Sequence, residues 1–128
     1  MSPHKNVDAF ESYFHTFPRL AERRDQPAGT LSGGEKKLLS LVRGLSENKP
    51  VIVIDEPTEG VQYENVMKMA NLVNTRKAEG TAFIIVEQNL TLVDEIADEL
   101  LVLDQGKIAL AGSASAISRA DIQAHMIV

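Results

Sequence analysis

Residues 31–58 read LSGGEKKLLSLVRGLSENKPVIVIDEPT, and this stretch decides the fold. Between its glycine pair and Pro50, apolar residues recur at helical spacing, which predicts an amphipathic helix over 38–45. The next residues, Val51–Ile54, are all apolar and β-branched, which is typical of a strand covered on both faces in a parallel sheet. The stretch therefore predicts a helix that leads into a buried strand.

The rest of the chain continues this alternation of helix and strand. Helical spacing of apolar residues predicts further helices at 7–17 and 66–73. The capping-box spacing of Thr91 and Asp94 predicts a short helix at 91–97, and the tail 115–126 is also expected to be helical. Pro18 is expected to end the first of them, and the polar residues 19–29 are expected to form a loop. A second buried strand is expected at 82–86, and a hairpin is expected around Gln105-Gly106.

This order of elements favours an α/β fold with a mostly parallel sheet and a C-terminal hairpin, organised as one domain over residues 1–128. In such sheets ligands bind beyond the carboxyl ends of the strands, so we expect the chemistry just after Ile54 and just after Val86. The apolar fraction of 44% suits a soluble globular domain. No apolar run approaches the roughly 20 residues of a membrane-spanning helix.

Two carboxylates stand where the first buried strand ends. One interpretation of Asp55-Glu56 is that the chain simply leaves the sheet with both acids in water, and Pro57 supports such an exit. The other interpretation is a Mg²⁺ site, because Mg²⁺ often takes one carboxylate together with substrate phosphates. The neighbouring carboxylate would then orient an attacking water or accept its proton. The residues alone leave both interpretations open.

A pair of glycines opens the predicted helix. Ser32 and Glu35 have the spacing of a capping box, which explains a helix N-terminus without any ligand. The box does not explain Gly33-Gly34, since glycines inside a helix cost about 1 kcal/mol each relative to alanine. They leave bare backbone at a helix N-terminus, where N–H groups and the helix dipole attract anions. This pattern predicts a phosphate-binding surface beside the cap.

Taken together, these features resemble the ATP-binding-cassette (ABC) ATPase family. The resemblance implies an incomplete P-loop NTPase-type fold in which 51–56 is the Walker B strand, with Asp55 in the Mg²⁺ shell and Glu56 as the catalytic base or water-orienting group. Gln88 stands where most of the family carry a switch histidine, which implies a second catalytic residue that contacts the γ-phosphate or a water. The signature motif, which binds ATP, corresponds to Leu31, Ser32, Gly33, Gly34 and Glu35.

Two parts of the family's pattern do not occur in these 128 residues. There is no G-x-x-x-x-G-K-[ST] phosphate loop, and no glutamine-bearing loop can be identified before the signature. We therefore expect the later portion of one cassette domain, as a truncated gene product or fragment, without ATPase activity of its own. In the family each ATP lies between the phosphate loop of one subunit and the signature of its partner. That arrangement implies a second ABC ATPase subunit, identical or different, as a partner.

Three short segments point to a subfamily. Phe17–Leu20 (FPRL) and Val86–Asn89 (VEQN) resemble the ATPase subunits of branched-chain amino acid importers, and Asp55–Gln62 (DEPTEGVQ) resembles those of urea importers. The resemblance implies that ATP and Mg²⁺ are the cofactors and that membrane permease subunits are further partners. It also implies a cytoplasmic protein bound peripherally to the inner face of the cell membrane.

Two other classes share part of this pattern. DNA-repair ABC ATPases also carry Leu-Ser-Gly-Gly-Glu, usually beside long coiled coils or zinc modules, but this chain has no heptads and no Cys. Its net charge of −5, with scattered Lys and Arg, predicts no nucleic-acid partner. The third class is a non-catalytic module that docks on a complete ABC ATPase, which the missing phosphate loop favours. Whether the chain acts as an enzyme therefore stays open.

Overall fold

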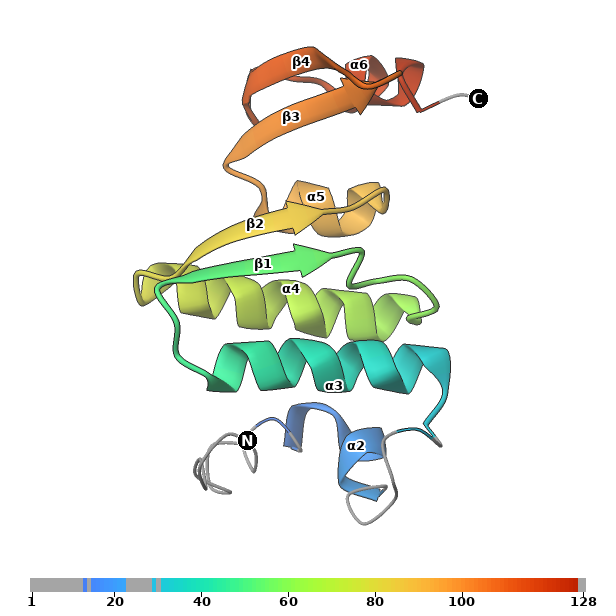
Figure 1. Ribbon diagram of the computed structural model, residues 1–128, viewed down its shortest axis with the longest axis vertical. Helices are drawn as coiled ribbons and strands as arrows, with labels where there is room; N and C mark the ends of the chain where they lie inside the picture. The colour runs from blue at the N-terminus through green and yellow to red at the C-terminus, as the bar shows by residue number, and fades with distance from the viewer. Residues whose placement is uncertain (1–12, 14, 23–28, 30, 127–128) are drawn as a thin grey trace. The chain divides into compact units, whose positions relative to one another are not determined.

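The computed structural model describes residues 13, 15–22, 29 and 31–126, which belong to two compact units (Figure 1). The first unit ends at Asn89, and the second begins at Leu90. The assignment of residues 1–128 to a single domain stays a prediction. The mixed α/β architecture, with one parallel and one antiparallel strand pair, confirms the predicted fold class.

The first unit is a parallel strand pair with helices on one side (Figure 1). Its elements are α2 (Pro18–Glu22), α3 (Gly33–Ser46), β1 (Val51–Asp55), α4 (Tyr63–Ala78) and β2 (Ala82–Val86). The two strands pair in register from Val51↔Ala82 to Asp55↔Val86. Because both strands end at the same edge, the loops that follow Asp55 and Val86 begin side by side.

The core of this unit lies between the strands and helices α3 and α4. Each helix buries one stripe at helical spacing, as predicted: Leu38, Leu41, Val42 and Leu45 on α3, and Val66, Met69, Ala70 and Val73 on α4. Phe17 and Ile52 form one buried cluster with the α3 stripe and with Met69 of α4. The longest of these helices, α4, has 16 residues, and no helix within the described ranges is both long enough and apolar enough to cross a membrane.

Within the described residues of the first unit, the helices cover one face of the strand pair. Successive strand residues point to opposite faces, and Ile52 is 8% exposed on the helix side. The opposite face carries apolar side chains with exposed fractions between 52% and 69%: Val51, Val53, Ile84 and Val86. The sequence predicted cover on both faces, because β-branched residues occupy both. Among the described residues, cover exists on the helix side alone.

The second unit is a hairpin flanked by two short helices. Its elements are α5 (Leu90–Ile96), β3 (Glu99–Asp104), β4 (Lys107–Ser113) and α6 (Arg119–Ala124). The hairpin turns where it was predicted, with φ of 51° at Gln105 and 75° at Gly106, and positive φ at both central residues is the mark of a type I′ turn. A cluster of Leu90, Val102 and Ile122 holds α5, β3 and α6 together.

The predicted C-terminal helix was too long. The sequence suggested 115–126, whereas α6 covers only 119–124. Ser118 caps it, because the Asp121 N–H donates to the Ser118 Oγ at 3.1 Å. A capping residue has extended backbone, so residues before it cannot belong to the same helix. Arg119 also donates to Asp94 at 2.8 Å, which ties α6 to α5.

The N-terminal prediction was partly wrong. Pro18 was expected to end a helix, and the helical residues Tyr13, His15 and Thr16 do stop before it, since Phe17 is not helical. The polar loop expected over 19–29 does not begin there, because Pro18 opens α2, which continues to Glu22. Proline suits the first position of a helix, where its missing N–H has no intrahelical partner. Most of the helix predicted over 7–17, and residues 23–28 of the predicted loop, lie outside the described residues.

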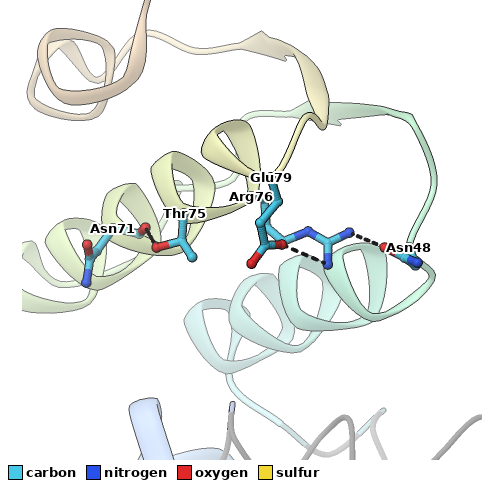
Figure 2. A network of polar contacts seen from close by, with 5 residues as sticks. All are labelled: Asn48, Asn71, Thr75, Arg76 and Glu79. Atoms are coloured by element: carbon cyan, nitrogen blue, oxygen red, sulfur yellow. Dashed lines mark hydrogen bonds and ion pairs between the residues drawn. The ribbon is translucent and has the colours of Figure 1, made fainter.

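A polar contact fixes the end of the first unit that lies away from the carboxyl ends of its strands (Figure 2). Arg76, in the last turn of α4, donates from Nη2 to the Asn48 Oδ1 at 3.0 Å, and its Nη1 lies 3.8 Å from the Glu79 Oε2. Asn48 has a φ of 52° in the turn between α3 and β1. The contact therefore holds the start of β1 against α4.

The pKa of Tyr13 is raised above its usual value. Burial of its hydroxyl raises the pKa more than the nearby positive charge of Arg76 lowers it.

Candidate functional site

The loop after β1 brings two carboxylates to the carboxyl edge of the strands. Glu56 has a φ of 47°, and its N–H donates to the Val86 carbonyl at 2.7 Å. This bond extends the β1–β2 ladder by one residue and places Glu56 beside the end of β2. Within the described part of the chain, the side chains of Asp55 and Glu56 have no hydrogen-bond or ion-pair partner. Both carboxylates are therefore free to accept a ligand.

Gln88 follows β2 at the same edge. Its side chain is exposed, and its backbone N–H donates to the Glu87 Oε1 at 2.9 Å. The other oxygen of Glu87 accepts from the Thr58 hydroxyl at 2.8 Å, across 29 residues of sequence. The structure therefore brings Glu56 and Gln88 to one edge, as predicted from the order of the strands. Their catalytic roles stay predictions.

Glu87 is the residue that the sequence analysis missed. It entered that analysis only as part of the segment Val86–Asn89, as a mark of the subfamily. Its position directly after a buried strand, like that of Asp55 after β1, was the available signal. That signal does not reveal a partner in the other loop, which only the paired strands supply.

The predicted capping box at the start of α3 is confirmed. The Glu35 N–H donates to the Ser32 Oγ, and the Ser32 N–H donates to the Glu35 Oε1, each at 3.1 Å. Because the Ser32 oxygen acts as an acceptor in the box, its hydroxyl hydrogen can still be donated to a ligand. Ser32 is exposed, whereas the Leu31 side chain is 8% exposed and anchors the segment.

The two glycines of the signature have different surroundings. A Cβ on Gly34 would stand 2.6 Å from the carbonyl oxygen of Gly60, whereas a Cβ on Gly33 would meet nothing within 4 Å. Gly60 lies in the loop after β1, so Gly34 allows α3 to approach that loop closely. The sequence argument treated both glycines as bare backbone for an anion. The structure gives Gly34 a packing reason and leaves Gly33 open to solvent.

This difference predicts opposite effects of two alanine substitutions. Gly34→Ala is expected to destabilise the first unit by about 1–3 kcal/mol, because the new methyl group overlaps backbone rather than a flexible side chain. Gly33→Ala is expected to be neutral or to stabilise by up to about 1 kcal/mol, since alanine favours a helix. Urea unfolding followed by circular dichroism measures both. Equal midpoints for the two variants would show that the Gly34–Gly60 approach does not constrain the fold.

The described residues fit a magnesium ion only as one carboxylate among other ligands. They contain no group of three or more His, Cys, Asp or Glu side chains that could hold a metal by themselves. Mg²⁺ commonly binds through one or two carboxylates and completes its shell with phosphate oxygens and water. The unpartnered carboxylate of Asp55 at the strand edge suits that mode. Its role as a metal ligand stays a prediction.

Comparison with known proteins gives one consistent family. The profile of the ABC transporter family matches residues 4–59. The high-affinity branched-chain amino acid transport ATP-binding protein BraG of Pseudomonas aeruginosa is 34% identical over 101 residues, which are 79% of this chain and 43% of BraG.

Solved structures agree in fold. MJ1267, an ATP-binding cassette of an ABC transporter, superposes with a TM-score of 0.69 at 32% identity, over 97% of this chain and 52% of that one. A dimeric structure of MJ0796, a bacterial ABC transporter cassette, has a TM-score of 0.72 at 20% identity, over 88% of this chain and 49% of that one. The chain thus spans about half the length of the relatives that it matches.

Proposed function

The chain belongs to the ABC transporter ATP-binding cassette family, and on that premise we propose that it forms part of an ATP site shared with a second cassette. The observation that carries the proposal is the N-terminus of α3. There Ser32 and Gly33 are exposed, and among the described residues a Cβ on Gly33 would meet nothing within 4 Å. The partial positive charge of the 14-residue helix and its free N–H groups favour a phosphate at this position.

The carboxyl edge of β1 and β2 serves the other ATP of such a pair. Glu56 orients the attacking water or accepts its proton, which its unpartnered carboxylate allows. Gln88 donates an amide N–H to the γ-phosphate or to that water, but it cannot take up a positive charge. Asp55 would hold Mg²⁺, which neutralises phosphate charge when it is bound together with the nucleotide.

The transported solute is proposed from the relatives. BraG is described as a branched-chain amino acid transport protein, and this supports an importer of branched-chain amino acids. The segment Asp55–Gln62 keeps urea as the alternative solute. In either case we propose membrane permease subunits as partners, with the chain at the cytoplasmic face of the cell membrane. Co-purification with such permeases separates this function from that of a DNA-repair ATPase.

The test is ATP-dependent association with a complete, hydrolysis-deficient cassette. Sedimentation velocity should show a complex with the wild-type chain in ATP, and Ser32→Arg should weaken it at least about tenfold, because a bulky side chain occupies the phosphate position. Ser40→Arg, which adds the same charge to an exposed position of the same helix, is the control and should associate like the wild type.

A second variant separates ligand binding from helix capping. Ser32→Asp keeps a good capping acceptor, so the stability of α3 should be retained. Its negative charge repels a phosphate, so association should still be lost. Unchanged association of both Ser32 variants would mean that Leu31–Glu35 is a helix cap alone.

The second candidate function is a non-catalytic module that pairs with a complete ATPase. The absence of a phosphate-loop motif from the 128 residues favours it. ATP hydrolysis by the chain joined to the phosphate-loop half of a cassette distinguishes the two candidates. Turnover that depends on the Glu56 carboxylate supports an ATPase subunit, whereas ATP-dependent pairing with a complete cassette without such turnover supports the module.

A further inference from the structure

The Glu87 carboxylate joins the two loops that carry the proposed catalytic residues. Its Oε2 accepts from the Thr58 hydroxyl at 2.8 Å and from the Thr58 N–H at 3.2 Å. Its Oε1 accepts from the N–H groups of Gln88 at 2.9 Å and Asn89 at 3.0 Å. Thr58 is 5% exposed, so its side of the contact is shielded from water. We refer to these four bonds as the Glu87 clasp.

The Glu87 clasp constrains the backbone next to Glu56 in one loop and next to Gln88 in the other. Thr58 lies two residues after Glu56 in the loop that follows β1, and Gln88 is the first residue after Glu87. The Glu56 N–H is itself bonded to the carbonyl of Val86, the residue before Glu87. The backbone positions of Glu56 and Gln88 are therefore fixed to each other through one carboxylate and one ladder bond.

A carboxylate suits this place because all four of its partners are donors. An ionised carboxylate only accepts, and its bonds to N–H and O–H groups are stronger than those between neutral groups. A glutamine of the same size would turn an NH₂ group towards at least one pair of donors. Replacing one carboxylate oxygen of Glu87 with an NH₂ group should therefore release one of the two loops.

We propose that Glu87 is a positioning residue: it holds the Gln88 backbone against the Glu56–Thr58 loop, so that the Glu56 carboxylate and the Gln88 amide can act on one water. The proposal rests on the proposed function, and it adds a residue that touches neither nucleotide nor water. The alternative is that Glu87 merely caps its own turn through Gln88 and Asn89. That alternative gives no role to Thr58, whereas the clasp requires its hydroxyl.

The experiment compares four variants in two measurements. The variants are Glu87→Gln, Thr58→Val, Thr58→Ser and Thr75→Val. Thr75→Val is the control, because it also removes a threonine hydroxyl bond, the 2.9 Å bond to the Asn71 carbonyl (Figure 2), away from the clasp. The first measurement is amide hydrogen exchange at Thr58, Gln88 and Asn89 in the chain without nucleotide. The second is steady-state ATP hydrolysis by the chain assembled with the cassette part that completes its site.

In the exchange measurement, Glu87→Gln should accelerate exchange at all three amides. Thr58→Val should accelerate it at Gln88, in the other loop, and Thr58→Ser should restore the wild-type rate. In the hydrolysis measurement, Glu87→Gln and Thr58→Val should lower kcat by about 10- to 100-fold with little change in KM for ATP, as expected for a residue that orients others. Thr75→Val should match the wild type in both.

Three outcomes separate the possibilities. Unchanged exchange in Glu87→Gln overturns the clasp. Faster exchange with an unchanged kcat overturns the positioning role, because the contact is then structural alone. If the assembled wild type does not hydrolyse ATP, the proposed function fails, and exchange at Gln88 in Thr58→Val and Thr58→Ser alone decides whether the clasp spans both loops.

Discussion

Ile52→Thr is expected to unfold the first unit, whereas Val53→Thr, at the next position of β1, is expected to leave it folded. Ile52 is 8% exposed and lies in the core cluster, while Val53 is 69% exposed on the opposite face. Placing a hydroxyl in the core and removing apolar volume there should cost about 2–5 kcal/mol. The same chemistry at an exposed position should stay within about 0.5 kcal/mol.

The exposed apolar face of the β1–β2 pair is also expected to promote self-association of the chain. An exposed apolar sheet face is prone to non-specific association. At about 25 cal/mol per Å², a few hundred Å² of such surface represents several kcal/mol, which is comparable to the net stability of a domain, roughly 5–15 kcal/mol. We therefore expect the chain alone to be marginally stable and to aggregate, and Val53→Thr combined with Ile84→Thr to reduce that aggregation.

Thermal unfolding at several concentrations, with sizing by light scattering, checks this prediction. The wild-type chain should show a concentration-dependent transition and particles larger than a monomer. A sharp, concentration-independent transition from a clean monomer would show that these 128 residues suffice for a stable fold. The exposed face would then need no cover.

Periodicity in the sequence was enough to predict most elements of the fold. The stripes of α3 and α4 recur every three or four residues, whereas the apolar runs of β1 and β2 are too short and too uniform for helices. The hairpin turn was predicted from Gly106, because glycine adopts a positive φ without steric cost. These are local properties, and local sequence specifies them.

The parts that sequence could not predict depend on contacts between distant segments. No residue near Gly34 in the sequence indicates that the backbone of Gly60 packs against it. The bond from Thr58 to Glu87 likewise forms only after β1 and β2 have paired, because the two residues are 29 positions apart in the sequence. Composition also could not say which face of β1 the helices cover, since both faces are apolar.

The site was predicted where such local signals coincide with topology. Topology predicted that the chemistry follows Ile54 and Val86, because parallel strands end at one edge, and the structure places Asp55, Glu56 and Gln88 there. Gln88 itself was singled out by the resemblance to the family. Their chemistry is inferred from the family, and it depends on a phosphate loop that the 128 residues do not contain. The largest effect is therefore expected on catalysis when that loop is supplied.

The chain by itself is expected to show no ATP turnover, because its 128 residues contain no phosphate-loop motif. Joined to the phosphate-loop half of a branched-chain amino acid cassette, it should hydrolyse ATP, and Glu56→Gln should lower kcat by about 10²- to 10⁴-fold. Glu59→Gln is the matched control, since it removes the charge of an exposed carboxylate in the same loop.

The most direct test of the central claim is the rate of ATP hydrolysis by this joined protein, measured beside its Glu56→Gln and Glu59→Gln variants. We expect turnover that Glu59→Gln retains and that Glu56→Gln lowers by about 10²- to 10⁴-fold. A folded joined protein that binds ATP but shows the same rate with and without the Glu56 carboxylate would contradict it.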